Sequence, residues 1–137
     1  MANGTVSLKK LLAKILEQFN YDYVIEKGTS GIWTYQKWYS GKRECWANIS
    51  YTGNTTTAWG NLYRSGNITV DDFPSNLFTA VPKTVVSARC STTGYQSCGC
   101  KARVVPTATN FGAVWLFRTV STSGNHTYYL SLYAIQN

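Results

Sequence analysis

Residues 31–51, GIWTYQKWYSGKRECWANISY, decide the fold of this 137-residue chain. Two runs dense in aromatic and β-branched residues, 32–39 and 43–51, flank the short segment Ser40-Gly41-Lys42. A short loop with glycine between two such runs predicts a β-hairpin, because glycine accepts the positive φ of a tight turn. Side chains alternate between faces along a strand, which puts Trp33 and Trp38 on opposite faces. We expect one of them in the core and the other at a protomer contact or in solvent.

Turn signals recur along the rest of the chain at intervals of about eight to twelve residues, a spacing typical of all-β sandwiches. We therefore predict a mostly β protein: an antiparallel β-sandwich, jelly-roll-like, over residues 21–137, preceded by one short N-terminal α-helix within residues 1–20. Segments 27–31 and 52–56 are predicted to be a turn and a loop. The further strands expected are 21–26, 58–63, 68–70, 77–81, 84–90, 101–105, 112–120 and 126–135.

An apolar stripe with helical spacing precedes the predicted β domain. Ser7 is a suitable N-cap for this helix, and the stripe comprises Leu8, Leu11, Leu12, Ile15, Leu16 and Phe19. So short a helix is marginal alone in water, and its stripe must therefore pack on something. Either it covers one end of its own domain, or it forms a three-chain coiled coil. We favour the homotrimer, with contact residues Leu8, Leu12, Ile15 and Phe19.

Composition argues against several classes of function. The formal net charge is +7, but no run of basic residues is longer than two, so the clustering typical of nucleic-acid binding is missing. Charged residues make up only 14% and aromatic residues 15%, which is typical of a β-rich extracellular or virion-surface domain. No stretch has the length of a membrane span, and no signal-peptide pattern is visible. We expect no nucleic-acid partner, no membrane, and synthesis in a cytoplasm.

Catalysis is not expected. The one histidine, His126, has no acidic residue near it in the sequence, and no Gly-x-Ser-x-Gly nucleophile elbow occurs. The acids beyond the N-terminal segment are Glu44, Asp71 and Asp72, a poor supply for the two carboxylates of a glycosidase. We predict that the protein is not an enzyme and has no catalytic residues and no cofactor.

The four cysteines are expected to have structural roles and not to form a reactive or metal-binding site. Cys45 is expected to be a small core residue on the hairpin. Cys98 and Cys100 are spaced too tightly for the usual zinc knuckle, and no metal site is predicted. A disulfide from Cys90 to Cys98 or Cys100 stays open, although cytoplasmic synthesis favours free thiols.

The aromatic residues carry the clearest indication of binding. Most belong to the core of a small β domain, but here they occur on both faces of their strands. Those at strand ends or beside Asn- and Gly-rich loops are Trp46, Trp59, Tyr63 and Tyr95. A ring there, beside Asn54, Asn61 or Arg64, is suited to stacking on a sugar while the polar groups bind its hydroxyls. The alternative is a trimer interface, where buried Tyr and Trp are also enriched.

Part of the sequence resembles a known family. The residues concerned are GTSGIWTY at 28–35, Lys37-Trp38, Ser40-Gly41, Glu44-Cys45-Trp46, Phe73-Pro74, LFTAVP at 77–82 and Tyr133-Ala134-Ile135. Over residues 21–137 the chain is similar to the C-terminal domain of tail-fibre and baseplate receptor-binding-like proteins from phages of Gram-positive bacteria. Residues 90–100 depart from that pattern. The resemblance implies synthesis in the host bacterial cytoplasm and a location in the virion, in a tail or fibre, with other tail proteins as partners.

A fibre attaches by one end and binds by the other, so the resemblance also implies where a ligand would bind. The helix marks the attached end, and we expect the site on loops 52–59 and 62–67 at the far end. The predicted ligand-binding residues are Trp59, Asn61, Tyr63 and Arg64. The expected function is adhesion to a host surface polysaccharide or teichoic polymer. Alternatives are a non-binding structural module that trimerises or caps a tail or capsid fibre, and a fragment of a cell-wall-degrading enzyme.

Overall fold

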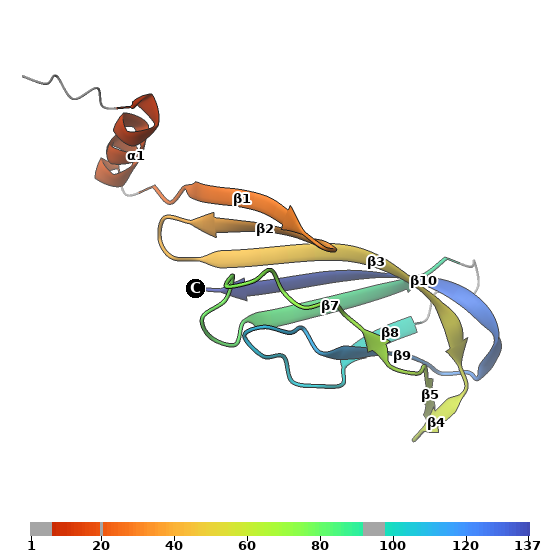
Figure 1. Ribbon diagram of the computed structural model, residues 1–137. Helices are drawn as coiled ribbons and strands as arrows, with labels where there is room; N and C mark the ends of the chain where they lie inside the picture. The colour runs from red at the N-terminus through yellow and green to blue at the C-terminus, as the bar shows by residue number, and fades with distance from the viewer. Residues whose placement is uncertain (1–6, 20, 92–97) are drawn as a thin grey trace, which may run out of the picture.

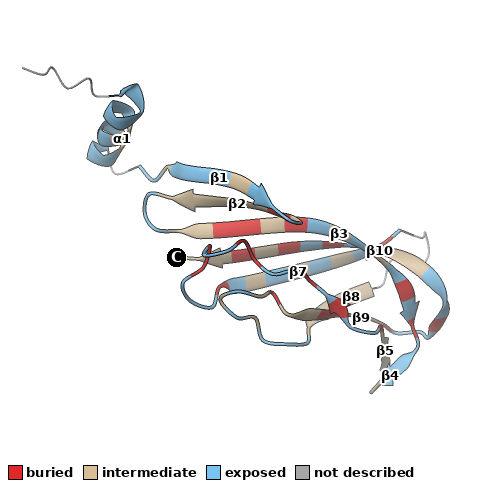
Figure 2. Ribbon diagram, in the orientation of Figure 1, coloured by how far each residue is buried: buried red, intermediate tan, exposed pale blue. Residues whose placement is uncertain are grey.

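The computed structural model describes residues 7–19, 21–91 and 98–137 (Figure 1). Helix α1, Leu8–Gln18, forms where the apolar spacing predicts it, and the Ser7 hydroxyl accepts a hydrogen bond from the Lys10 N–H at 3.3 Å. No residue of α1 is buried, and the helix is exposed along its length (Figure 2). The interpretation in which α1 covers one end of its own domain is therefore wrong. Among the described residues, no helix combines the length and the apolar character needed to cross a bilayer.

Five strands form a long antiparallel sheet in the order β1-β2-β3-β10-β7 (Figure 1). The hairpin predicted from residues 31–51 is present as β2 and β3, with Gly41 at φ 94° in its turn. The two longest strands, β3 and β10, stay paired from one end of the sheet to the other. In sheet order, the bounds are Val24–Ser30, Trp33–Trp38, Arg43–Thr55, Thr122–Gln136 and Lys83–Cys90.

The second sheet is built around β9, Ala113–Arg118. Strand β8, Cys98–Ala102, pairs along one edge of β9, while β5, Leu62–Arg64, and β6, Ile68–Thr69, pair along the other. Strand β4, Thr57–Trp59, joins β5 as a hairpin. All these pairings are antiparallel, which confirms the predicted antiparallel β-sandwich with a short N-terminal helix.

The core contains one of the two tryptophans that the strand alternation places on opposite faces. Trp33 is 1% exposed and packs its ring against Phe73 and Phe111, at centroid distances of 5.2 and 5.8 Å. Trp38 lies half-buried on the opposite face of the same strand, as the alternation predicts. Cys45 is fully buried, which confirms its prediction as a core residue. All four cysteines are free thiols.

Two predicted boundaries are wrong because pairing with a neighbouring strand overrides local turn signals. Strand β1 begins at Val24 instead of residue 21, and it continues through the predicted turn 27–31 as far as Ser30, because its residues find partners on β2. The predicted loop 52–56 belongs mostly to β3, which follows β10 as far as Thr55.

The predicted strand 58–63 is in fact the β4–β5 hairpin. Gly60 takes φ 59° and reverses the chain between Trp59 and Leu62, which pair across the turn. A positive φ at the first central position of a two-residue loop is a common hairpin geometry. The glycine here therefore ends a strand instead of interrupting one.

The predicted strand 77–81 is irregular in the structure. The Leu77 N–H closes a turn on the Pro74 carbonyl at 3.0 Å, and Asn76 has φ 57°. Leu77 and Phe78 are nevertheless buried. Their apolar character reflects packing against the core, without any strand pairing.

Candidate functional site

The outward side of the second sheet carries rings and cations that we call the aromatic–cationic face. In β9, Val114 and Leu116 are fully buried, so the alternating Trp115 and Phe117 point away from the core. Neighbouring strands add side chains at matching positions, with Lys101 paired to Trp115 and Arg64 to Phe117. The face comprises Trp59, Arg64, Lys101, Arg103, Trp115 and Phe117.

Trp115 lies at the centre of this face. The guanidinium carbon of Arg64 is 4.2 Å from its ring centroid, and that of Arg103 is 5.4 Å away. These distances are within the range of cation–π attraction. The indole Nε1 donates a hydrogen bond to Asn67 Oδ1 at 2.8 Å. The Trp115 ring is thus held by contacts with residues on both sides of β9.

Trp59 and Phe117 complete the aromatic part of the face. The Trp59 ring lies 6.0 Å from the rings of both Trp115 and Phe117, and Lys101 Nζ lies 5.3 Å from it. Gly99 on β8 makes room for Phe117, because a Cβ at that position would overlap the phenyl ring. The rings and cations therefore form one contiguous surface across β4, β5, β8 and β9.

The face is electrostatically one-sided. None of its three cations is ion-paired: the ion pairs among the described residues join Lys37 to Glu26 and Lys42 to Glu44. All six acidic residues of the chain lie outside β4, β5, β8 and β9. Like charges gathered without compensation raise the local potential, so this surface is suited to an anionic or polar ligand.

Two of the four predicted ligand-binding residues, Trp59 and Arg64, belong to this face. Tyr63 is paired with Arg118, whose side chain is buried, and it therefore points to the inner side of the sheet. Asn61 is exposed in the β4–β5 turn. The predicted residues lie on or between strands, although the loops 52–59 and 62–67 were expected to carry them.

Sequence reasoning missed Lys101, Arg103, Trp115 and Phe117. A signal exists for Trp115 and Phe117, because the alternation in AVWLFR at 113–118 leaves two large rings on the face opposite two aliphatic residues. Trp46, also a candidate, is half-buried on the first sheet. Tyr95 lies outside the described residues.

The aromatic–cationic face and the helix lie far apart. In Figure 1, β4 and β5 are at the end of the molecule opposite α1. The long strands β3 and β10 run between the two ends. This geometry places the exposed apolar residues of α1 and the aromatic–cationic face at opposite ends of the molecule.

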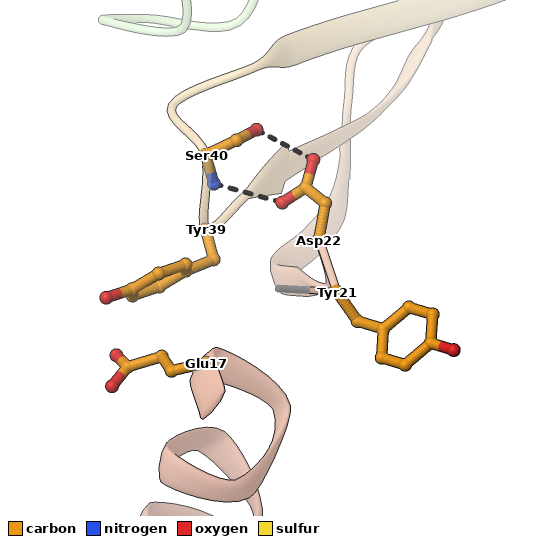
Figure 3. Close-up of a pocket in the computed structure, with 5 residues that line it drawn as sticks. All are labelled: Glu17, Tyr21, Asp22, Tyr39 and Ser40. Atoms are coloured by element: carbon orange, nitrogen blue, oxygen red, sulfur yellow. Dashed lines mark hydrogen bonds between the residues drawn. The ribbon is translucent and has the colours of Figure 1, made fainter. Parts of the chain in front are cut away.

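A hollow of about 390 Å³ lies where α1 and the segment that leads to β1 meet the β2–β3 turn (Figure 3). Within it, Asp22 accepts hydrogen bonds from the Ser40 hydroxyl and N–H at 2.7 and 3.0 Å, which lower the pKa of Asp22. The Glu17 carboxylate on α1 raises the pKa of the Tyr39 hydroxyl. The polar groups of the hollow interact with one another, so we assign it as a structural junction.

The fold and the face define a class: a two-sheet antiparallel β-sandwich with an exposed N-terminal helix and a surface of rings and cations at the far end. Its fold is similar to that of two solved R1 pyocin fibre structures. One is an N-truncated R1-type pyocin tail fibre, with a TM-score of 0.54 at 12% identity over 98% of this chain and 99% of that chain. The other is a C-terminal part of the P. aeruginosa R1 pyocin fibre, with a TM-score of 0.50 at 12% identity over 98% of this chain and 32% of that one. At this identity the likeness shows a shared fold. No protein-family model and no curated protein sequence matches the chain.

Proposed function

We propose that this chain is a tail-fibre virion protein that assembles as a homotrimer through α1 and adheres, without catalysis, to a polysaccharide or teichoic polymer of the host surface. The observation that carries the proposal is the aromatic–cationic face at the end opposite an exposed apolar helix (Figure 1). One end is suited to contact with other copies and other tail proteins, and the other end to a ligand. The fold shared with pyocin tail fibres supports the same assignment. An origin in a phage of Gram-positive bacteria stays a prediction.

The helix supports the trimeric part of the proposal. Its own domain leaves Leu8, Leu12 and Ile15 exposed, at 81%, 55% and 42% of their surface. Removing apolar surface from water is worth about 25 cal/mol per Å², so an exposed stripe favours association. Two further copies of this chain are the proposed occupants, because three parallel stripes bury one another in a coiled coil. Three sites on one fibre would also multiply the avidity of a weak single site.

A structural module that trimerises or caps a fibre without any ligand is the second candidate. The exposed stripe of α1 serves that function equally well. The two candidates differ in what they require of the aromatic–cationic face: adhesion needs it, whereas a cap needs only α1 and the β-sandwich.

Binding of labelled protein to a panel of bacterial strains and to a glycan array separates the two. We expect the parent to bind, and Trp59→Ala and Arg64→Ala to bind about tenfold more weakly, with melting temperatures within a few degrees of the parent. Arg89→Ala is the matched control, because Arg89 also contacts a ring, that of Tyr129, but on the first sheet. A trimer that binds neither cells nor glycans would favour the structural module. Equal binding by all variants would place the site elsewhere.

A further inference from the structure

We infer that the aromatic–cationic face binds a polyanionic surface polymer through the guanidinium groups of Arg64 and Arg103, and not a neutral sugar stacked on a tryptophan. This inference rests on the proposed function and narrows its ligand to a polymer that carries phosphate or carboxylate groups.

Trp115 is poorly suited to stacking on a sugar, because its ring and its indole N–H already have partners. Its ring is approached by the guanidinium groups of Arg64, on β5, and of Arg103, the residue after β8. Its only N–H is already donated to Asn67. Sugar stacking needs an open ring face, and here the two arginines compete for it. Trp115 therefore serves to position cations.

Trp59 also has a cation over its ring. Lys101 Nζ lies over its ring, 5.3 Å from the centroid, and the ring centroids of Trp115 and Phe117 are each 6.0 Å from that of Trp59. Each ring–cation contact on this face thus holds a positive group over an aromatic surface. The rings order the charges, which reduces the entropy that the long side chains lose when a ligand binds.

The positive charges of this face are available to a ligand. Arg64 Nη1 donates to the Ser65 carbonyl at 3.2 Å, which leaves most of its five N–H groups unused. No carboxylate pairs with Arg64, Lys101 or Arg103 in the described part of the chain. A guanidinium presents a planar fork that fits the two oxygens of a phosphate or a carboxylate. Two forks and an ammonium side by side match a polymer with repeated anionic groups.

The test measures retention of the full chain on three immobilised polymers over a salt gradient: polyphosphate, polygalacturonate and neutral dextran. We expect retention on the two anionic polymers and none on dextran, with affinity falling as salt rises. The phosphate and carboxylate arms distinguish the two possible sources of charge. An Arg64→Gln/Arg103→Gln variant is expected to lose at least about tenfold in affinity, since a hydrogen bond to a charged group is worth about that factor or more. Arg89→Gln removes one guanidinium from the other sheet and is expected to bind like the parent.

Retention on dextran equal to that on the anionic polymers overturns the inference, as does binding that is independent of salt. These two outcomes need no substitution, so they hold even if the double variant folds poorly. Single-stranded DNA is immobilised as a fourth polymer, and tighter retention on it than on polyphosphate would also overturn the inference, because a nucleic acid would then be the better ligand. A parent that binds cells but not the anionic polymers contradicts only this inference, whereas a parent that binds no cells contradicts the proposed function itself.

Discussion

Trp38 donates a hydrogen bond from its indole Nε1 to Glu44 Oε1 at 2.9 Å, across the β2–β3 hairpin and on the side of the sheet away from the core. Gln36 and Tyr133 donate to the same carboxylate, which is only 7% exposed. Burial by itself would raise the pKa of Glu44, but the hydrogen bonds outweigh burial and hold that pKa below its ordinary value. A buried carboxylate thus links β2, β3 and β10 on a surface that is otherwise open to solvent.

Glu44→Gln is expected to lower the free energy of unfolding by about 1–3 kcal/mol at neutral pH, because at least one of the three donors loses its acceptor. The folded-state pKa lies below the unfolded one, so the stabilisation is present above the ordinary carboxyl pKa and is lost as the pH falls through the folded-state value. Urea unfolding at neutral and acid pH measures both effects. The gap between variant and parent should narrow in acid. A gap that is constant with pH would contradict the assignment. Asp71→Asn, at an exposed carboxylate, is the control.

Substitution of the two tryptophans of β2 should separate core packing from surface contact. Trp33→Ala is expected to cost about 3–5 kcal/mol, since it leaves a cavity against Phe73 and Phe111. Trp38→Ala loses a half-exposed ring and one hydrogen bond to Glu44, and about 1–2 kcal/mol is expected. Chemical denaturation monitored by circular dichroism gives both values. Equal losses would show that the two rings are not on different faces.

A Leu12→Asp/Ile15→Asp double variant is expected to prevent the proposed trimer from forming and to leave the β signal in circular dichroism unchanged, because no residue of α1 is buried in the β domain. Light scattering at micromolar concentration measures the mass. The matched control is Lys10→Asp/Lys14→Asp, on the opposite side of the helix, which should remain trimeric. A parent that is monomeric at this concentration would remove α1 as an assembly element.

Gly99→Ala is expected to disturb the aromatic–cationic face from below, because the added methyl overlaps the Phe117 ring. Overpacking of this kind costs about 1–3 kcal/mol, and the displaced ring should also weaken ligand binding. Thermal unfolding and the polymer retention assay measure the two effects. Gly66→Ala is the control, since a Cβ there meets nothing within 4 Å. If both variants behave like the parent, Phe117 is free to move and is not part of a fixed surface.

Local periodicity is sufficient to predict those features of the fold that lie within a single strand or helix. The opposite faces of Trp33 and Trp38 follow from strand alternation alone, and the α1 stripe follows from helical spacing. The β4–β5 hairpin was missed because Gly60, in a run of strand-forming residues, looks like a weak strand position until its positive φ is known.

The candidate site needed information that no local pattern contains. Arg64, Lys101 and Trp115 come from three strands, and they meet because β9 is paired on both edges. The sequence identified Trp59 and Arg64 from their setting near loops, whereas the ring that organises the face, Trp115, lies in the middle of a strand. Which strands become neighbours depends on the topology of the whole sheet.

The antiparallel pairing of β1, β2 and β3 has a mechanical consequence. Strand β1 follows α1, and β3 ends at Thr55, separated from β4 only by Thr56. Tension applied between α1 and β4 would enter the sheet through β1 and leave it through β3, along the strand axes, and would act to slide both strands past β2, with which both are paired. In that direction the hydrogen bonds of an antiparallel ladder bear the load together, whereas peeling would break them one after another. A particle anchored at α1 and tethered at the opposite end would thus pull the domain along its most force-resistant direction.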